Sequence, residues 1–140
     1  MPGRFKHILV PLDFSDKNDV ALETVHELVS SSTSVISLLH VIEPIGSSDD
    51  AEVQKFTLQL QEHAEKELLK RAQMFSDLDI TITCENRSGN RVNETLAFAK
   101  DNEIDLIVLN SHQIKDSETS SASISYQIAI LASCPVLLLK

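Results

Sequence analysis

Five short runs of Ile, Val and Leu, separated by longer segments with a helical spacing of apolar residues, constrain this chain most. The runs cover residues 7–12, 34–42, 80–84, 105–109 and 135–139. None of them alternates cleanly between apolar and polar residues, which is typical of strands covered on both faces. Strands that alternate with crossover helices pair in parallel. The pattern therefore predicts an α/β fold, a three-layer sandwich with helices on both faces of a five-stranded parallel sheet.

Two long helices are predicted between the first three runs. Ser15 or Asp16 is placed to accept the free N–H groups at the start of the first helix. Its apolar face is predicted to hold Val20, Ala21, Thr24, Val25, Leu28 and Val29. The second helix is expected over residues 49–75, because one stripe holds Val53, Phe56, Leu60, Ala64, Leu68, Ala72 and Phe75.

Two shorter helices are predicted between the last three runs. The first of them follows a loop at Gly89-Asn90 and is defined by Val92, Leu96 and Ala99. The second covers residues 122–132, where the apolar positions are Ile124, Ile128, Ala129 and Leu131.

Length and charge limit the classes of protein. At 140 residues, the chain predicts one domain over residues 1–140. A net charge of −9 repels phosphate backbones and anionic lipids, so neither nucleic acid nor membrane is an expected partner. The N-terminal apolar run is too short for a signal peptide or a membrane span, which favours a cytoplasmic protein. Cys84 and Cys134 are interpreted as two reduced thiols that act as small core residues.

The segments just past the predicted strands are residues 13–15, 43–46, 85–89 and 110–113. They include most of the polar groups that could form a site. In a doubly wound parallel sheet, ligands bind outside the carboxyl ends of the strands, where the strand order reverses. Any small-molecule site is therefore predicted at that crevice.

Several of these segments resemble the universal stress proteins in the same order along the chain. The matching segments are residues 6–15 (KHILVPLDFS), 38–44 (LLHVIEP), 89–99, 105–108 (DLIV) and 134–138 (CPVLL). The resemblance covers essentially the whole chain. It implies a Rossmann-like fold of the adenine nucleotide alpha hydrolase-like type with strand order 3-2-1-4-5, a dimer formed through the last strand, and a role in stress responses.

Many members of that family bind ATP or another adenine nucleotide. They use an Asp at the end of the first strand and a stretch of form G-x-x-G, nine residues, then G-[ST], after the fourth strand. Asp13 matches the acid, Ser15 lies at the following helix start, and Val41 matches the position whose backbone meets adenine. The positions implied for a bound nucleotide are Pro11, Asp13, Ser15, Val41, Asn110, Ser111, His112, Gln113 and Ser123.

The phosphate half of that motif is altered. Asn110 and Gln113 replace the two glycines, and Ser123-Ile124, or Ala122-Ser123 with a one-residue gap, replaces Gly-Ser. A phosphate cradle needs closely approaching backbone N–H groups in turns that often require positive φ. We therefore expect no tight ATP binding and no obligatory cofactor, although AMP or ATP stays an alternative ligand. Asp13 has an equal second interpretation, as an acceptor at the start of a helix.

No metal site or catalytic group is predicted. The five histidines, of which His40 and His112 lie near strand ends, do not form ligand pairs at helical spacing with each other or with cysteine. His40 and His112 are interpreted as structural. The chain also lacks a G-x-S-x-G nucleophile elbow and a P-loop, so an enzyme such as a slow ATPase is the least favoured class.

The last apolar run predicts an association surface. A strand at the edge of a sheet exposes unpaired backbone groups, and two such edges pair about a two-fold axis. We expect a homodimer through Val136, Leu137, Leu138 and Leu139, with a covered monomeric edge as the alternative. Two function hypotheses follow: a non-catalytic stress-response protein that acts on unidentified protein partners or by weak ligand sensing, and an adenine-nucleotide sensor.

Overall fold

A computed structural model describes residues 5–29, 34–44, 50–111 and 123–140. Its strands are β1 (His7–Pro11), β2 (Val35–Ile42), β3 (Thr81–Ser88), β4 (Leu106–Asn110) and β5 (Val136–Leu139). Its helices are α1 (Asn18–Leu28), α2 (Ala51–Ala72), α3 (Arg91–Asp101) and α4 (Ser123–Leu131), and a 3₁₀ turn, η1 (Gln73–Phe75), extends α2.

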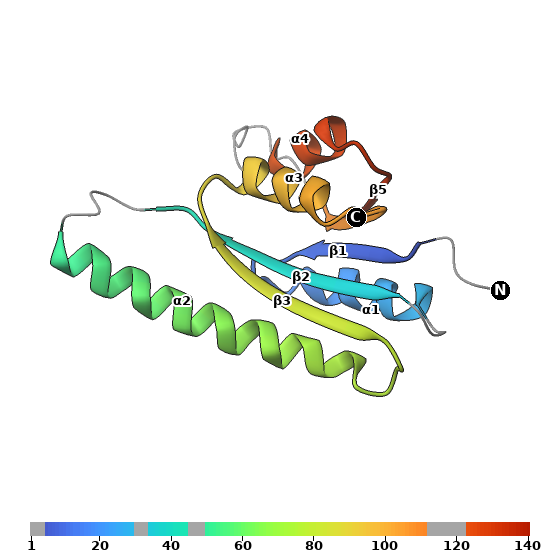
Figure 1. The fold of residues 1–140 in the computed structure, drawn as a ribbon, viewed down its shortest axis with the longest axis horizontal. Coiled ribbons are helices and arrows are strands. Elements are labelled where there is room, and N and C mark those ends of the chain that lie inside the picture. Colours follow the sequence, from blue (N-terminus) through green and yellow to red (C-terminus); the bar gives the residue numbers. More distant parts are fainter. Residues whose placement is uncertain (1–4, 30–33, 45–49, 112–122) are drawn as a thin grey trace.

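The five strands form one parallel sheet of order β3-β2-β1-β4-β5 (Figure 1). The order reverses between β1 and β4, where Ile8 pairs with Leu106 and Leu9 with Ile107. This arrangement confirms the predicted α/β fold and strand order. It also places the carboxyl ends of β1 and β4 side by side at the reversal, which is where such sheets hold ligands.

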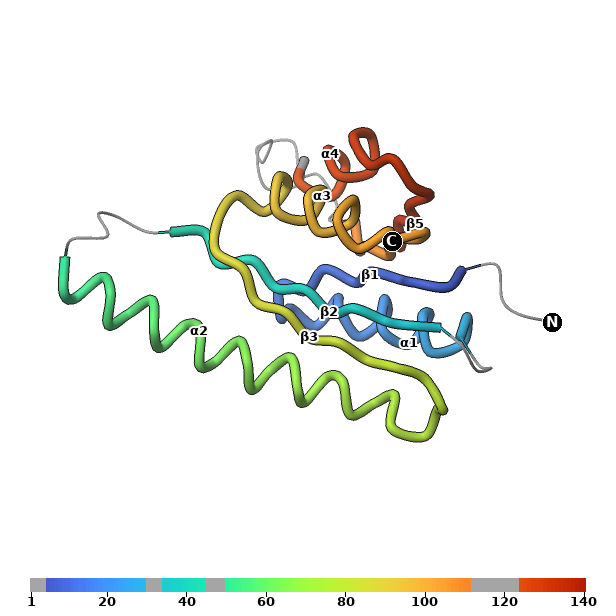
Figure 2. Tube along the Cα trace, in the orientation of Figure 1, coloured from blue at the N-terminus to red at the C-terminus, as the bar shows by residue number. Residues whose placement is uncertain are grey.

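Helices cover both faces of the sheet, with α1 and α2 on one side and α3 and α4 on the other (Figure 2). Successive side chains of β1 alternate between the two resulting cores. Ile8 and Val10 pack with α1 and α2, whereas Leu9 packs with α3 and α4. The alternation follows from the pleat of the strand. The central strand is therefore apolar at every position between His7 and Pro11, as the sequence pattern indicates.

The third predicted strand differs from the structure. The run at 80–84 was expected to be covered on both faces, but β3 extends to Ser88 and most of its residues are exposed. It pairs with β2 on one side, and α2 packs on one of its faces. Cys84, predicted to lie in the core, is exposed, and Cys134 is half-buried. An edge strand needs fewer apolar residues than a central one, so its polar end gave no strand signal.

Helix α1 corrects two further expectations. Lys17 precedes its first turn and provides no side-chain cap, so neither Ser15 nor Asp16 has the predicted capping role. Val20 and Leu28 were placed on the apolar face but are 46% and 50% exposed. The buried face holds the predicted Ala21 and Val25 and also Leu22, which was not predicted there. The helix starts later than predicted, and Val20 and Leu28 lie outside the stripe that faces the sheet.

The apolar stripe of α2 is buried only near its C-terminal end. Ala64 and Leu68 are buried, and Phe75 of η1 fills the core below, but Phe56 is 49% exposed. The first turns of α2 extend past the end of β3 (Figure 2), which leaves that part of the stripe without a sheet to cover. In the last helix, Leu131 is likewise exposed although it was predicted on the apolar face.

Candidate functional site

The turn after β1 is shaped by Asn18 of α1. The buried Asn18 side chain accepts hydrogen bonds through Oδ1 from the N–H groups of Asp13, at 3.1 Å, and Phe14, at 2.8 Å. Phe14 has a φ of 65°, a left-handed conformation that costs an aromatic residue on the order of 1–3 kcal/mol. A buried acceptor for two adjacent N–H groups offsets that strain and fixes the turn at the strand-end crevice.

Asp13 is exposed at the mouth of this turn. Its Oδ1 accepts a hydrogen bond of 2.9 Å from the N–H of Ser15, within the turn itself. The expected capping of a helix start is therefore replaced by a local Asx turn. The Ser15 hydroxyl oxygen is buried and has no hydrogen-bond partner in the part of the chain that the structure describes. Together with Pro11, the last residue of β1, these residues lie at the strand end where the order of the sheet reverses.

The backbone of Val41, near the end of β2, faces the end of β1. The Val35 N–H bonds to the Lys6 carbonyl, and the Leu39 carbonyl accepts from the Leu12 N–H, so odd residues of β2 direct their backbone groups towards β1. The register of β1 ends where Pro11 pairs with Leu39. Val41 lies two residues further on, so its N–H and C=O point to the side where β1 has ended.

At the end of β4, the polar groups are engaged by the protein's own backbone. Ser111 donates twice to the Leu139 carbonyl, from its N–H at 2.7 Å and from Oγ at 3.1 Å. The Ser125 hydroxyl donates to the Asn110 carbonyl at 2.8 Å. Only the Asn110 side-chain oxygen, which is buried, has no partner among the described residues. Ser111 is therefore part of the β4–β5 connection rather than a free donor for phosphate.

The remaining predicted phosphate residues cannot be placed. His112 and Gln113 lie outside the described residues, and Ser123 is described only as the first residue of the α4 backbone. The interpretation of His112 as structural therefore also falls outside the described residues. In the ranges that the structure describes, no group of three or more His, Cys, Asp or Glu side chains is arranged to hold a metal ion.

A cluster of aromatic and basic side chains surrounds Phe14, and the sequence analysis did not predict it. The His40 ring stacks on Phe14 with centroids 4.1 Å apart, and the His63 ring approaches Phe14 edge-on at 6.2 Å. The Arg71 guanidinium lies 5.0 Å from the Phe14 centroid and donates to the Phe14 carbonyl at 3.4 Å. Arg71 also pairs with Glu67. The strained turn is thus held from β2 and from α2.

His40 supports the same turn through its ring nitrogen. Nδ1 is 2.7 Å from the Leu12 carbonyl, so this nitrogen carries the proton. Burial lowers the pKa of His40 from its ordinary value, with smaller lowering effects from Arg91 and His63, while the Leu12 bond and Asp13 oppose the shift. Its role is structural, as the sequence predicts. Because burial disfavours the charged form of His40, the ring that stacks on Phe14 does not add a positive charge next to Arg71.

Sequence reasoning missed Asn18, Phe14 and Arg71 as site-forming residues. One signal was present: Asn is a weak helix former, and at the start of a helix its side chain usually serves the preceding turn. The contacts of Arg71 with Phe14 span 57 residues of sequence and have no local signal.

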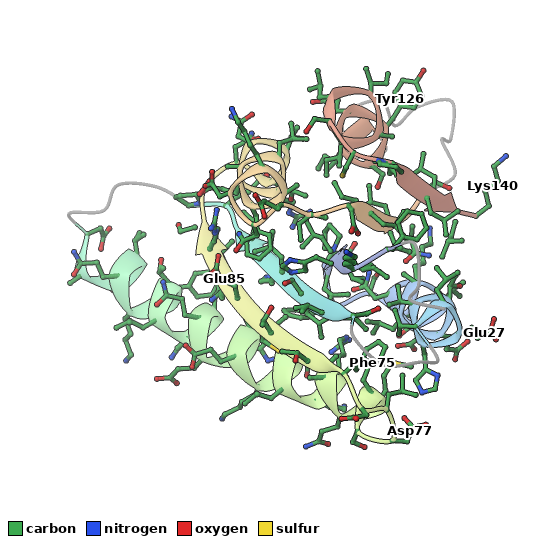
Figure 3. All side chains as sticks on the ribbon, turned by 45° about the vertical axis from the view of Figure 1, so that its right-hand side comes forward. Glu27, Phe75, Asp77, Glu85, Tyr126 and Lys140 are labelled. Atoms are coloured by element: carbon green, nitrogen blue, oxygen red, sulfur yellow. The ribbon has the colours of Figure 1, made fainter. Side chains whose placement is uncertain are left out.

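The predicted dimer residues occupy the expected position. β5 is the outer strand beyond β4, and Val136, Leu137, Leu138 and Leu139 are each half-buried. Tyr126 of α4 is 62% exposed and points away from the sheet (Figure 3). No described helix has the length and apolar character required to cross a membrane.

A doubly wound, five-stranded parallel sheet with an acidic turn at its point of reversal places the chain among the Rossmann-like α/β proteins. The model of the universal stress protein family matches residues 4–140. The chain belongs to the universal stress protein family.

Solved structures share this fold at low sequence identity. Universal stress protein UspA from Lactobacillus plantarum is 23% identical with a TM-score of 0.83, covering 99% of this chain and 100% of that chain. A universal stress protein in complex with cAMP is 16% identical (TM-score 0.71, 97% of each chain). An Arabidopsis thaliana family member with AMP bound is also 16% identical (TM-score 0.70, 96% and 91%). No curated protein matches the sequence.

Proposed function

We propose that this chain is a non-catalytic, cytoplasmic universal stress protein that dimerises through β5 and does not bind ATP tightly. It acts by protein association or by weak ligand sensing. The observation that carries the proposal is the hydrogen bonding at the end of β4. Both donors of Ser111 bond to the Leu139 carbonyl, and the Ser125 hydroxyl bonds to the Asn110 carbonyl. Ser111, one of the positions implied for phosphate binding, is therefore committed to the fold.

Side-chain size supports the same conclusion. Asn110 carries a side chain where the family motif has glycine, so the backbone there cannot approach a phosphate group as closely as glycine allows. The net charge of −9 adds an unfavourable field for a polyanion. Each factor lowers affinity for ATP more than for a ligand with fewer phosphates.

Calorimetry with ATP, ADP, AMP and cyclic AMP at moderate salt tests the proposal. We expect no micromolar affinity for ATP. The matched variants are Asp13→Ala, which removes the acid of the nucleoside wall, and Asn110→Gly, which restores the glycine of the motif. Micromolar ATP binding that disappears in Asp13→Ala would overturn the proposal. Release of phosphate from ATP by the unmodified protein would contradict its non-catalytic part.

A second candidate, an adenine-nucleotide sensor, is supported by the nucleoside wall. The Val41 backbone faces the crevice side, and Ser15 contributes a buried hydroxyl without a described partner. Structures of family members with cAMP and with AMP show that related folds accept such ligands. Binding of AMP or cyclic AMP with weaker binding of ATP in the same calorimetry experiment would favour this candidate.

The dimer has its own test. β5 pairs with β4 through odd residues, since the Pro135 and Leu139 carbonyls accept from Ile107 and Ser111, so Leu138 directs its backbone outwards. We expect Leu138→Asp to give a monomeric or aggregated protein by light scattering. Phe56→Asp, an exposed apolar position on α2, is the control and should leave the dimer intact. An unchanged dimer mass in Leu138→Asp would exclude this interface.

A further inference from the structure

Helix α4 is apolar on its outer side as well as on the side that faces the sheet. Ile128 is buried in the core, whereas Tyr126, Ile130 and Leu131 are 62%, 62% and 61% exposed. Large apolar side chains that gather on one exposed element mark a surface that meets another molecule. From residue 123 to residue 139, the chain contains no Asp, Glu, Lys, Arg or His. The surface formed by α4 and the neighbouring strand β5 therefore carries no side-chain charge.

Ser125 shows how α4 is turned relative to the sheet. Its hydroxyl donates to the Asn110 carbonyl at the end of β4, at 2.8 Å. Ser125 and Leu131 lie three residues before and three residues after the buried Ile128, so they are about 60° to either side of it around the helix. The Ser125 flank faces β4, and the Leu131 flank faces away from β4. Because α4 packs on β5, the next strand outwards (Figure 3), the Leu131 flank faces the outer edge of the sheet.

Pairing at β5 determines where the partner's α4 lies. Two identical strand edges pair antiparallel about a two-fold axis perpendicular to the sheet, because the hydrogen-bond pattern of an antiparallel pair is symmetric and that of a parallel pair is not. Rotation about that axis keeps each face of the sheet on its own side. The partner's α4 therefore lies on the same face of the joined sheet, directly across the axis.

The spacing of strands and helices brings the two α4 helices into contact. Neighbouring strands are about 4.8 Å apart, and packed helices are about 8–10 Å apart. α4 packs on β5 and is bonded to the end of β4, so its axis lies above these two strands. A helix above the gap between them is about one strand spacing from the two-fold axis and about two spacings from its copy. Two such helices meet along the flank that carries Leu131.

We propose that the dimer interface extends from β5 onto α4, with the Leu131 flank of each α4 packed against the same flank of the partner's α4. The inference rests on the proposed β5 dimer and adds a helix pair to it. The occupant is a second copy, because strand pairing at β5 carries that copy's α4 to this flank. Contact through uncharged surfaces also brings no like charges together, although each chain carries a net charge of −9.

Sedimentation equilibrium over a series of protein concentrations tests the proposal through the Kd of the dimer. Leu131→Lys should raise the Kd at least about tenfold, because it removes an apolar contact and places two ammonium groups at the axis. Leu69→Lys is the matched control: Leu69 is 62% exposed on α2, next to β3 at the opposite edge of the sheet, and its replacement should not weaken the dimer. Leu131→Met keeps an apolar side chain and should retain the dimer.

The control also removes a general effect of charge. An added lysine makes the net charge of each chain less negative, so it reduces the overall repulsion between two copies. Weakening by Leu131→Lys alone is therefore specific to its position. Equal Kd values for Leu131→Lys and Leu69→Lys would overturn the proposal. Circular dichroism checks that the variants are folded.

Cross-linking provides a readout that does not depend on affinity. In a chain with Cys84→Ser and Cys134→Ala, a short bismaleimide should join Leu131→Cys to its copy and should not join Leu69→Cys. Equal cross-linking of the two would indicate random collision and would overturn the helix contact.

The same measurements separate this inference from the proposed function. A parent protein that is monomeric at every concentration would overturn the β5 dimer and the helix contact together. A dimer that Leu138→Asp disrupts and Leu131→Lys leaves unchanged would keep the β5 interface and overturn only the contact between the α4 helices.

Discussion

The central strand β1 and the first half of the outer strand β3 both contain β-forming residues, but the two strands have opposite surroundings. Ile8, Leu9 and Val10 of β1 are completely buried, whereas most of β3 is exposed. β1 lies between two strands and beneath helices on both faces, while β3 has one neighbouring strand and one covering helix, α2. The number of covering layers, rather than strand propensity, decides how much each strand contributes to the core.

The largest expected difference concerns stability. Ile107 of β4 is completely buried, so Ile107→Ala should lower the free energy of unfolding by about 2–5 kcal/mol. Ile82 of β3 is half-buried, and Ile82→Ala removes the same atoms at a cost of about 1 kcal/mol. Urea denaturation of both variants measures the contrast. Equal losses would show that β3 is as integral to the core as β4.

A smaller effect is expected at the turn between the core and the crevice. Asn18→Ala removes the acceptor for the Asp13 and Phe14 N–H groups and should destabilise the protein by roughly 1–3 kcal/mol. Asn93→Ala, at an exposed position of α3, is the control. If the two variants unfold at the same urea concentration, the Asn18 bonds do not stabilise the turn.

The smallest effect is a dependence on pH at the end of β2. The pKa of His40 is lowered in the folded state, mainly by burial, from an ordinary value of 6.5. The unfolded chain therefore takes up the proton first, and stability is lost as pH falls below that value. His40→Gln keeps a side-chain donor and should lose less stability between about pH 7.5 and pH 5.5. If the free energy of unfolding changes equally with pH in His40→Gln and in the parent protein, His40 is not a source of the pH dependence.

Much of the fold was predictable because central parallel strands are distinctly apolar. The runs at 7–12 and 105–109 correspond to β1 and β4 within one residue at each end. The C-terminal half of β3 was missed because Glu85, Asn86 and Arg87 have no apolar pattern; an edge strand needs none. Val20 and Leu28 were misplaced because both are apolar, although the stripe that faces the sheet runs through Asn18, Leu22 and Val25.

The sequence predicted which residues lie at the strand ends but not how they are bonded there. Asp13 and Val41 do lie at the ends of β1 and β2, where the rule for parallel sheets places a ligand site, and that site stays a prediction. The bonds from Ser111 to Leu139 depend on residues 28 positions apart, and sequence reasoning offered Ser111 as a ligand for phosphate. Contacts that fold distant segments together decide which polar groups are available, and no local pattern reports them.

The alternating direction of the β3 backbone has a consequence for hydrogen exchange. Thr81 N–H is bonded inside the sheet, whereas the amides of Cys84 and Asn86 face outwards. Outward amides exchange with deuterated solvent without any opening of the structure, while inward amides wait for β2 and β3 to separate. Exchange rates along β3 are therefore expected to alternate between fast and slow from one residue to the next.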